Sequence, residues 1–96
     1  MENEEMITVR EFCMSHNIET SFVDELYEAG LLEVTREENT IFISHDQLPE
    51  LEKLVRWRYE MDINLEGIEV IHHLLQQMKE MQYEIRELKN KIGMYE

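Results

Sequence analysis

The feature that most constrains this chain is a regular row of apolar side chains in its C-terminal third. Apolar residues recur there at alternating steps of three and four, and no proline interrupts them. The row consists of Ile71, Leu74, Met78, Met81, Ile85, Leu88, Ile92 and Tyr95. This spacing is the a/d repeat of a coiled-coil helix, and most residues between are Gln, Glu, Lys or Arg. The pattern predicts one long helix over residues 65–95 with a single narrow apolar face.

A helix with so narrow an apolar face needs another helix to cover it. It could pack back on its own domain, or pair with the same helix from a second copy. The rest of the chain is too small to supply a helix of matching length, so we expect a homodimer. A parallel pair would place Glu84 at a g position opposite Lys89 at an e position, which is attractive. The direction of pairing stays open.

The chain is strongly acidic, and its charge is unevenly distributed. Its 96 residues include 22 acidic and 9 basic side chains, for a formal net charge of -13. Residues 1–30 hold eight acids and a single base, Arg10. This composition disfavours a nucleic-acid backbone as the partner and favours a basic protein surface. The alternative is that the charge only keeps the protein soluble.

Catalytic, metal and cofactor chemistry finds little support in the sequence. The adjacent His72 and His73 point about 100° apart on a helix and cannot face one ion together. His16 and His45 are expected on the surface. Cys13 is the only cysteine, which excludes a disulfide framework and favours a small core residue over a nucleophile. We therefore predict no enzyme, no catalytic or metal-binding residue and no cofactor.

No stretch of the sequence has the pattern of a signal peptide or of a membrane-spanning helix. A reducing cytoplasm is the simplest location for a chain with one cysteine. We expect a cytoplasmic protein with no membrane partner.

Residues 7–30 predict two short helices joined by a tight turn, which is a helix-turn-helix. Thr8 and Glu11 have the spacing of a capping box, which starts a helix over residues 9–15. Asn17 suits the left-handed position that ends it, and Gly30 suits the same position after a helix beginning near Thr20. The side chains expected to face inward are Val9, Phe12, Cys13, Val23, Leu26 and Tyr27. Residues 1–6 are polar and are expected to fray.

Residues 31–44 change to the alternating pattern of a small β-hairpin, with strands near 32–35 and 40–44 and a polar turn at 36–39. This hairpin is the wing of a winged helix-turn-helix. A third helix is expected from Asp46, its predicted cap, to Asp62, with Pro49 tolerated in the first turn. Its expected packing face is Leu48, Leu51, Leu54, Val55 and Met61. Asn64 is the predicted cap of the long helix. We therefore expect a winged helix-turn-helix domain over residues 1–62 and a C-terminal coiled-coil dimerisation helix over residues 63–96.

This order of elements resembles the MerR family. Residues 62–68 (DINLEGI) are similar to that family's G-[F/Y]-[S/T]-L-x-x-I linker, and residues 30–32 (GLL) to the start of its wing. Residues 7–13 (ITVREFC) and 56–61 (RWRYEM) resemble more closely the CbpM family of chaperone modulators. The resemblance covers about residues 7–95, although the second helix is unusually acidic and the last one rich in Met and Ile.

The CbpM resemblance implies a small protein that binds and restrains the J domain of a DnaJ/CbpA-type co-chaperone. It carries over no list of contact residues, so our candidates come from chemistry. Asp24 and Glu28 share one helical face, with Glu25 beside them, and no base is near in sequence. Arg56 and Trp57 are the candidate anchor, because such residues are enriched at binding hot spots. Core packing of Trp57 is the alternative.

MerR relatives suggest an antiparallel pairing of the long helix and a rival function, binding of DNA. A recognition helix needs Arg, Lys, Asn or Gln aimed at base edges, with cations for phosphates. The second helix offers no Lys or Arg, and the wing offers Arg36 beside Glu37 and Glu38. We therefore expect a mainly α, MerR-like winged helix-turn-helix homodimer that binds a J domain. DNA-binding regulation is the alternative.

Overall fold

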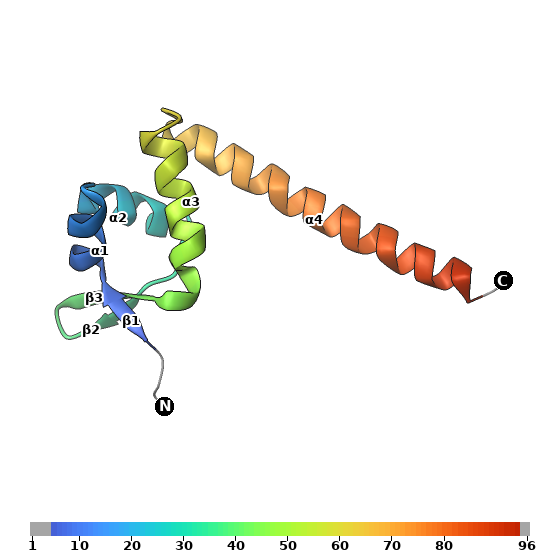
Figure 1. Ribbon diagram of the computed structural model, residues 1–96, viewed down its shortest axis with the longest axis horizontal. Helices are drawn as coiled ribbons and strands as arrows, with labels where there is room; N and C mark the ends of the chain where they lie inside the picture. The colour runs from blue at the N-terminus through green and yellow to red at the C-terminus, as the bar shows by residue number, and fades with distance from the viewer. Residues whose placement is uncertain (1–4, 95–96) are drawn as a thin grey trace.

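The computed structural model describes residues 5–94 and confirms the predicted fold class (Figure 1). A head of short helices and a small sheet is followed by one long helix, the stalk, that projects away from it. The elements are β1 (Met6–Thr8), α1 (Val9–His16), α2 (Thr20–Glu28), β2 (Thr35–Glu37), β3 (Thr40–Ser44), the 3-10 turn η1 (His45–Gln47), α3 (Leu48–Tyr59) and α4 (Leu65–Gly93). The division at residues 62 and 63 stays a prediction.

The helix-turn-helix forms as its capping residues predict. The Thr8 hydroxyl accepts from the Glu11 amide at 3.0 Å, and the Glu11 carboxylate accepts from the Thr8 amide at 3.2 Å. Asn17 ends α1 with φ 58°, and Gly30 follows α2 with φ 81°. The amide of Leu31 then reaches back to a carbonyl of α2, which closes the helix end.

One prediction about the inward face of α2 is wrong. Phe22, Val23 and Leu26 are buried, whereas Tyr27 is 49% exposed. The three buried positions span about 100° of the helix, and Tyr27 lies about 40° beyond that arc. Tyr27 therefore lies outside the buried face of α2.

The wing carries a third strand that the sequence pattern did not reveal. The sheet is antiparallel with the order β1-β3-β2, and Ile7 of β1 pairs with Ile43 of β3. Met6 is therefore ordered in a strand, which corrects the expectation that the chain frays up to this residue. The hairpin strand β2 begins at Thr35, although the sequence pattern predicted that it begins near residue 32. Glu38 lies in the turn that follows and has a positive φ of 55°.

The third helix differs from its predicted bounds at both ends. Ser44, and not Asp46, provides the capping oxygen, which accepts from the Asp46 amide at 3.1 Å and starts the turn η1. The helix α3 ends at Tyr59, and Asp62 then adopts φ 59°. Met61 therefore lies in the loop and is 60% exposed, so its predicted place on the packing face is wrong. Pro49 lies in the first turn of α3, as predicted.

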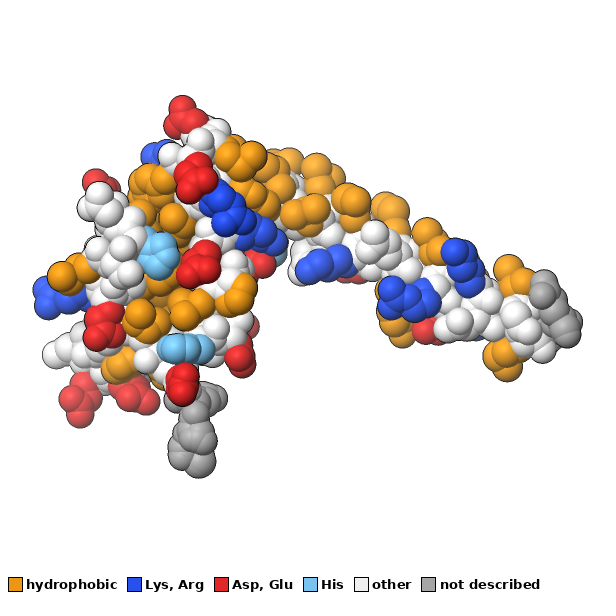
Figure 2. Space-filling view, viewed as in Figure 1, with side chains coloured by type: hydrophobic (Ala, Val, Ile, Leu, Met, Phe, Trp, Pro, Cys, Tyr) orange, Lys and Arg blue, Asp and Glu red, His pale blue; other side chains and the backbone are white. Residues whose placement is uncertain are grey.

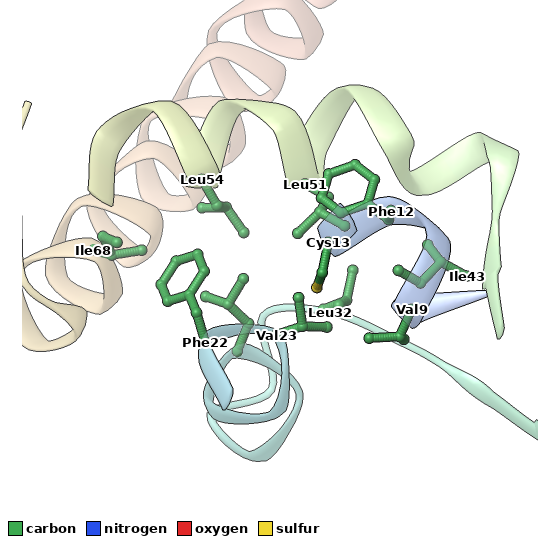
Figure 3. Packing of buried hydrophobic residues seen from close by; sticks show 11 residues of the cluster. Val9, Phe12, Cys13, Phe22, Val23, Leu32, Ile43, Leu51, Leu54 and Ile68 are labelled. Atoms are coloured by element: carbon green, nitrogen blue, oxygen red, sulfur yellow. The ribbon is translucent and has the colours of Figure 1, made fainter. Parts of the chain in front are cut away.

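The stalk begins at the predicted cap and is tied to the head by its first turn. The Asn64 side chain accepts from the Gly67 amide at 2.8 Å. Ile68, one turn into α4, is completely buried among head residues (Figure 3). The other core residues are Val9, Phe12, Cys13, Phe22, Val23, Leu26, Leu32, Ile43, Leu51 and Leu54. Among the described residues no helix is apolar and long enough to cross a membrane.

Candidate interaction site

The acidic face of α2, formed by Asp24, Glu25 and Glu28, is exposed to solvent. All three side chains are exposed, and α2 contains no basic residue. The ion pairs found among residues 5–94 join other acids to Lys53 or to histidines, and none involves these three carboxylates. The face therefore keeps its negative charge available for a cationic partner.

A groove separates the acidic face from the wing. Thr20 and Asp24 of α2 line it on one side, and Asn39, Thr40 and Ile41 line it on the other. Its volume is about 560 Å³, and Arg10 is a basic residue in its wall. Of the acidic face, only Asp24 lines this groove.

The two predicted anchor residues lie apart from the acidic face and in different environments. Arg56 is exposed and lines a second cavity of about 380 Å³ with Ile18 and Tyr59, which shares no residue with the α2 groove. Trp57 is half-buried against the core, and the Lys53 ammonium lies 5.3 Å from its ring centroid. The structure thus favours the alternative that Trp57 packs against the core. The role of Arg56 and Trp57 as a joint anchor stays a prediction.

The apolar row of the stalk is exposed along its length. Figure 2 shows hydrophobic side chains following one edge of α4 outward from the head. From Leu74 to Ile92 each member of the row is 51 to 60% exposed, while Ile71 is half-buried beside the head. These residues, Ile71, Leu74, Met78, Met81, Ile85, Leu88 and Ile92, form the seam; the expected last member, Tyr95, lies outside the described residues. Such a surface is large for a solvated helix.

The histidines make structural contacts. His16 stacks on Phe12 with 4.0 Å between ring centroids, and its Nδ1 lies 3.1 Å from the Phe12 carbonyl oxygen. His72 lies on α4 with its Nδ1 3.7 Å from a Glu50 carboxylate oxygen of α3. Within residues 5–94 no group of three potential ligands is arranged to hold a metal ion.

Cys13 is a buried core residue whose surroundings disfavour the thiolate. Burial raises the pKa of its thiol above the ordinary value of 9.0, and the nearby charge of Asp24 raises that pKa further. A reactive cysteine needs the opposite shift, because the thiolate is the nucleophile. The geometry therefore gives Cys13 a packing role.

Sequence reasoning missed Tyr27 as a residue of this surface. Tyr27 continues the exposed face of α2 beside Asp24 and Glu28, although it was expected in the core. The signal that could have placed it correctly is the triplet Phe22, Val23 and Leu26, which already completes an inward arc without it.

Together these features define a winged helix-turn-helix protein with an acidic second helix and an apolar stalk. A family model described as MerR HTH family regulatory protein matches residues 7–90. The chain therefore belongs to the MerR family, as the linker and wing motifs indicated. No curated protein and no solved structure matches the chain.

Proposed function

We propose that this protein is a chaperone modulator of the CbpM type, which binds the J domain of a DnaJ-type co-chaperone and restrains it. The observation that carries this proposal is the acidic, uncompensated face of Asp24, Glu25 and Glu28. In a helix-turn-helix that reads DNA, the second helix is the one that enters the major groove. Here that helix suits a cationic protein surface, and the resemblance implies that a J domain presents one.

The motifs that resemble the CbpM family occupy defined places in the fold. Residues 7–13 contain most of β1 and the capped start of α1, and residues 56–61 contain the end of α3. Both segments contribute to the head that holds α2 in place, so the resemblance and the acidic face concern one structural unit. This agreement supports the finer assignment within the MerR family.

The proposal includes a homodimer formed through the stalk. The seam of α4 is half exposed from Leu74 to Ile92, and a second copy supplies a helix of the same length and spacing. Pairing would remove this apolar area from water and leave the acidic face on the head uncovered. Each dimer would then present two such faces.

Titration of fluorescently labelled J domain from the same cell with the full-length protein tests this function. We expect saturable binding that weakens as salt is added, because screening reduces attraction between exposed charges. A J domain whose basic helix carries Glu in place of Lys and Arg is the control, and it should bind much more weakly. Absence of binding by the unaltered J domain up to high micromolar protein would reject the proposal.

A second candidate, DNA-binding regulation, is favoured by membership of the MerR family. The charges oppose it, because α2 offers no Lys or Arg and the wing combines Arg36 with exposed Glu37 and Glu38. Acids placed against phosphates oppose the electrostatic attraction on which even non-specific binding rests. An electrophoretic mobility shift assay with duplex DNA separates the two candidates.

A further inference from the structure

Tyr27 borders the acidic face of α2 on one continuous surface. It follows Asp24 by three residues and precedes Glu28 by one, so its side chain points about 60° from the first and about 100° from the second. Its side chain is 49% exposed, while the same helix fills the core with Phe22 and Leu26. A large aromatic ring is thus held at the edge of a cluster of carboxylates.

Two other aromatic residues of the head already have cations of this chain near their rings. The Lys53 ammonium lies 5.3 Å from the centroid of Trp57, and the Arg58 guanidinium lies 5.4 Å from that of Tyr59. Tyr59 also meets the edge of Phe22, with 5.5 Å between ring centroids. No such contact to Tyr27 is found within residues 5–94. Tyr27 is therefore a half-exposed ring beside which no cation of the described residues lies.

An exposed tyrosine flanked by carboxylates has the chemistry of a cation receptor. The ring attracts Lys or Arg through its quadrupole, and Arg more often than Lys. The neighbouring acids Asp24 and Glu28 add charge attraction and hydrogen-bond acceptors for the same cation. The ring also supplies the apolar contact area that an exclusively charged rim lacks, and tyrosine is enriched at binding hot spots for this reason.

We propose that Tyr27 is the aromatic anchor of this surface and receives a Lys or Arg side chain from the basic helix of the J domain. This inference rests on the proposed function. It places the anchor on α2, in place of the earlier candidates Arg56 and Trp57 on α3. The occupant is a cationic helix, because α2 carries three exposed acids and no base beside the exposed Tyr27 ring. Charge brings the partner to α2, and the Tyr27 ring holds it there.

The test compares J-domain binding by the full-length protein and the variants Tyr27→Ala, Tyr27→Phe and Tyr83→Ala. Tyr83 is a matched control, because it is 59% exposed, lies next to Glu84 on a helix and is outside the seam. We expect Tyr27→Ala to raise Kd about tenfold, mainly through faster dissociation, because a desolvated cation–π contact has this magnitude. Tyr27→Phe keeps the ring and should bind within about threefold of wild type, as should Tyr83→Ala.

The possible results separate this inference from the proposed function. If wild type binds the J domain and Tyr27→Ala binds equally well, the anchor assignment is wrong while the partner stands. A loss in Tyr27→Phe as large as in Tyr27→Ala would also overturn it, since the hydroxyl and not the ring would then matter. If wild type does not bind at all, both proposals fail. Far-UV circular dichroism of each variant verifies that α2 is folded.

Discussion

Gly67 lies so close to Ile63 that a β-carbon at this position would come within 2.8 Å of the Ile63 Cγ2 atom. It would also lie 3.2 Å from the Asn64 Oδ1 atom that caps the stalk. Glycine therefore lets the linker fold closely over the first turn of α4, next to the buried Ile68. The close contact explains why a residue with poor helix propensity occupies a helix here.

Replacing Gly67 by alanine should destabilise the fold. The overlap with Ile63 forces a shift next to the core, and we expect the free energy of unfolding to fall by about 1–3 kcal/mol. Gly93→Ala is the control, because its added β-carbon has no neighbour within 4 Å. Urea unfolding of both variants at one protein concentration measures the difference. Equal urea midpoints for Gly67→Ala and wild type would contradict this prediction, because they would show that Ile63 moves aside without loss of stability.

A charge at the centre of the seam should dissociate the proposed dimer. Ile85 is exposed in the single chain and lies at an a position, so Ile85→Lys would bury an unpaired ammonium between two helices. Tyr83→Lys, outside the seam, should leave the assembly intact. Light scattering at protein concentrations on the order of tens of micromolar gives the masses. A monomeric wild type under these conditions would remove the dimer from the proposal.

The protein alone should not shift duplex DNA at physiological salt. The acidic face of α2 and the single Arg36 on the wing offer too little positive charge to release counterions. The measurement is an electrophoretic mobility shift assay over a pool of sequences, with a basic helix-turn-helix protein as the positive control. Retardation of one particular sequence at nanomolar protein would favour the regulator.

Charge reversal on α2 should slow association with the J domain. The triple variant Asp24/Glu25/Glu28→Lys should lower the association rate constant at least about tenfold at low salt, because steering raises on-rates by roughly this factor or more. The control Glu69/Glu80/Glu87→Lys changes net charge equally at exposed positions of the stalk outside the seam. Stopped-flow fluorescence measures both rates. An equal effect of the two triple variants would mean that total charge, and not the α2 face, governs encounter.

Stability should depend on alkaline pH through Cys13. Because the pKa of its thiol is raised in the folded state, the unfolded chain loses this proton first, near its ordinary pKa of 9.0. The contribution to stability is therefore complete below this pH, and it is lost as the pH rises from there through the higher pKa of the folded state. The difference in free energy of unfolding between wild type and Cys13→Ala should shrink as the pH rises above about 9.0, the ordinary pKa of the thiol. A difference that stays constant would contradict the buried thiol.

Local signals in the sequence predicted most of the fold. The capping box of Thr8 and Glu11, the left-handed Asn17 and Gly30, and the cap Asn64 are each determined by neighbours within a few residues. Such short-range chemistry can be read directly from the order of residues. The long heptad row likewise predicted a single long helix, which the structure shows as the stalk α4.

Features set by distant neighbours could not be predicted in the same way. The strand β1 is three residues long and exists because Ile7 pairs with Ile43, far along the chain. Tyr27 faces outward because the core takes up Phe22, Val23 and Leu26 of α2, and Tyr27 lies beyond the arc that these three form. For the candidate site, sequence reasoning found the acids, which helical periodicity places, and missed the aromatic residue beside them, which tertiary packing places.

The burial of Ile68 packs the first turn of the stalk into the core of the head. Because this side chain of α4 is completely enclosed by the head, the direction of the helix is fixed by packing and not by a flexible tether. In a dimer paired along α4, the two copies of α2 would then be held at one set separation and orientation. Simultaneous capture of two partner molecules, or of two sites on one assembly, would depend on matching that span, and avidity would be lost when the geometry differs.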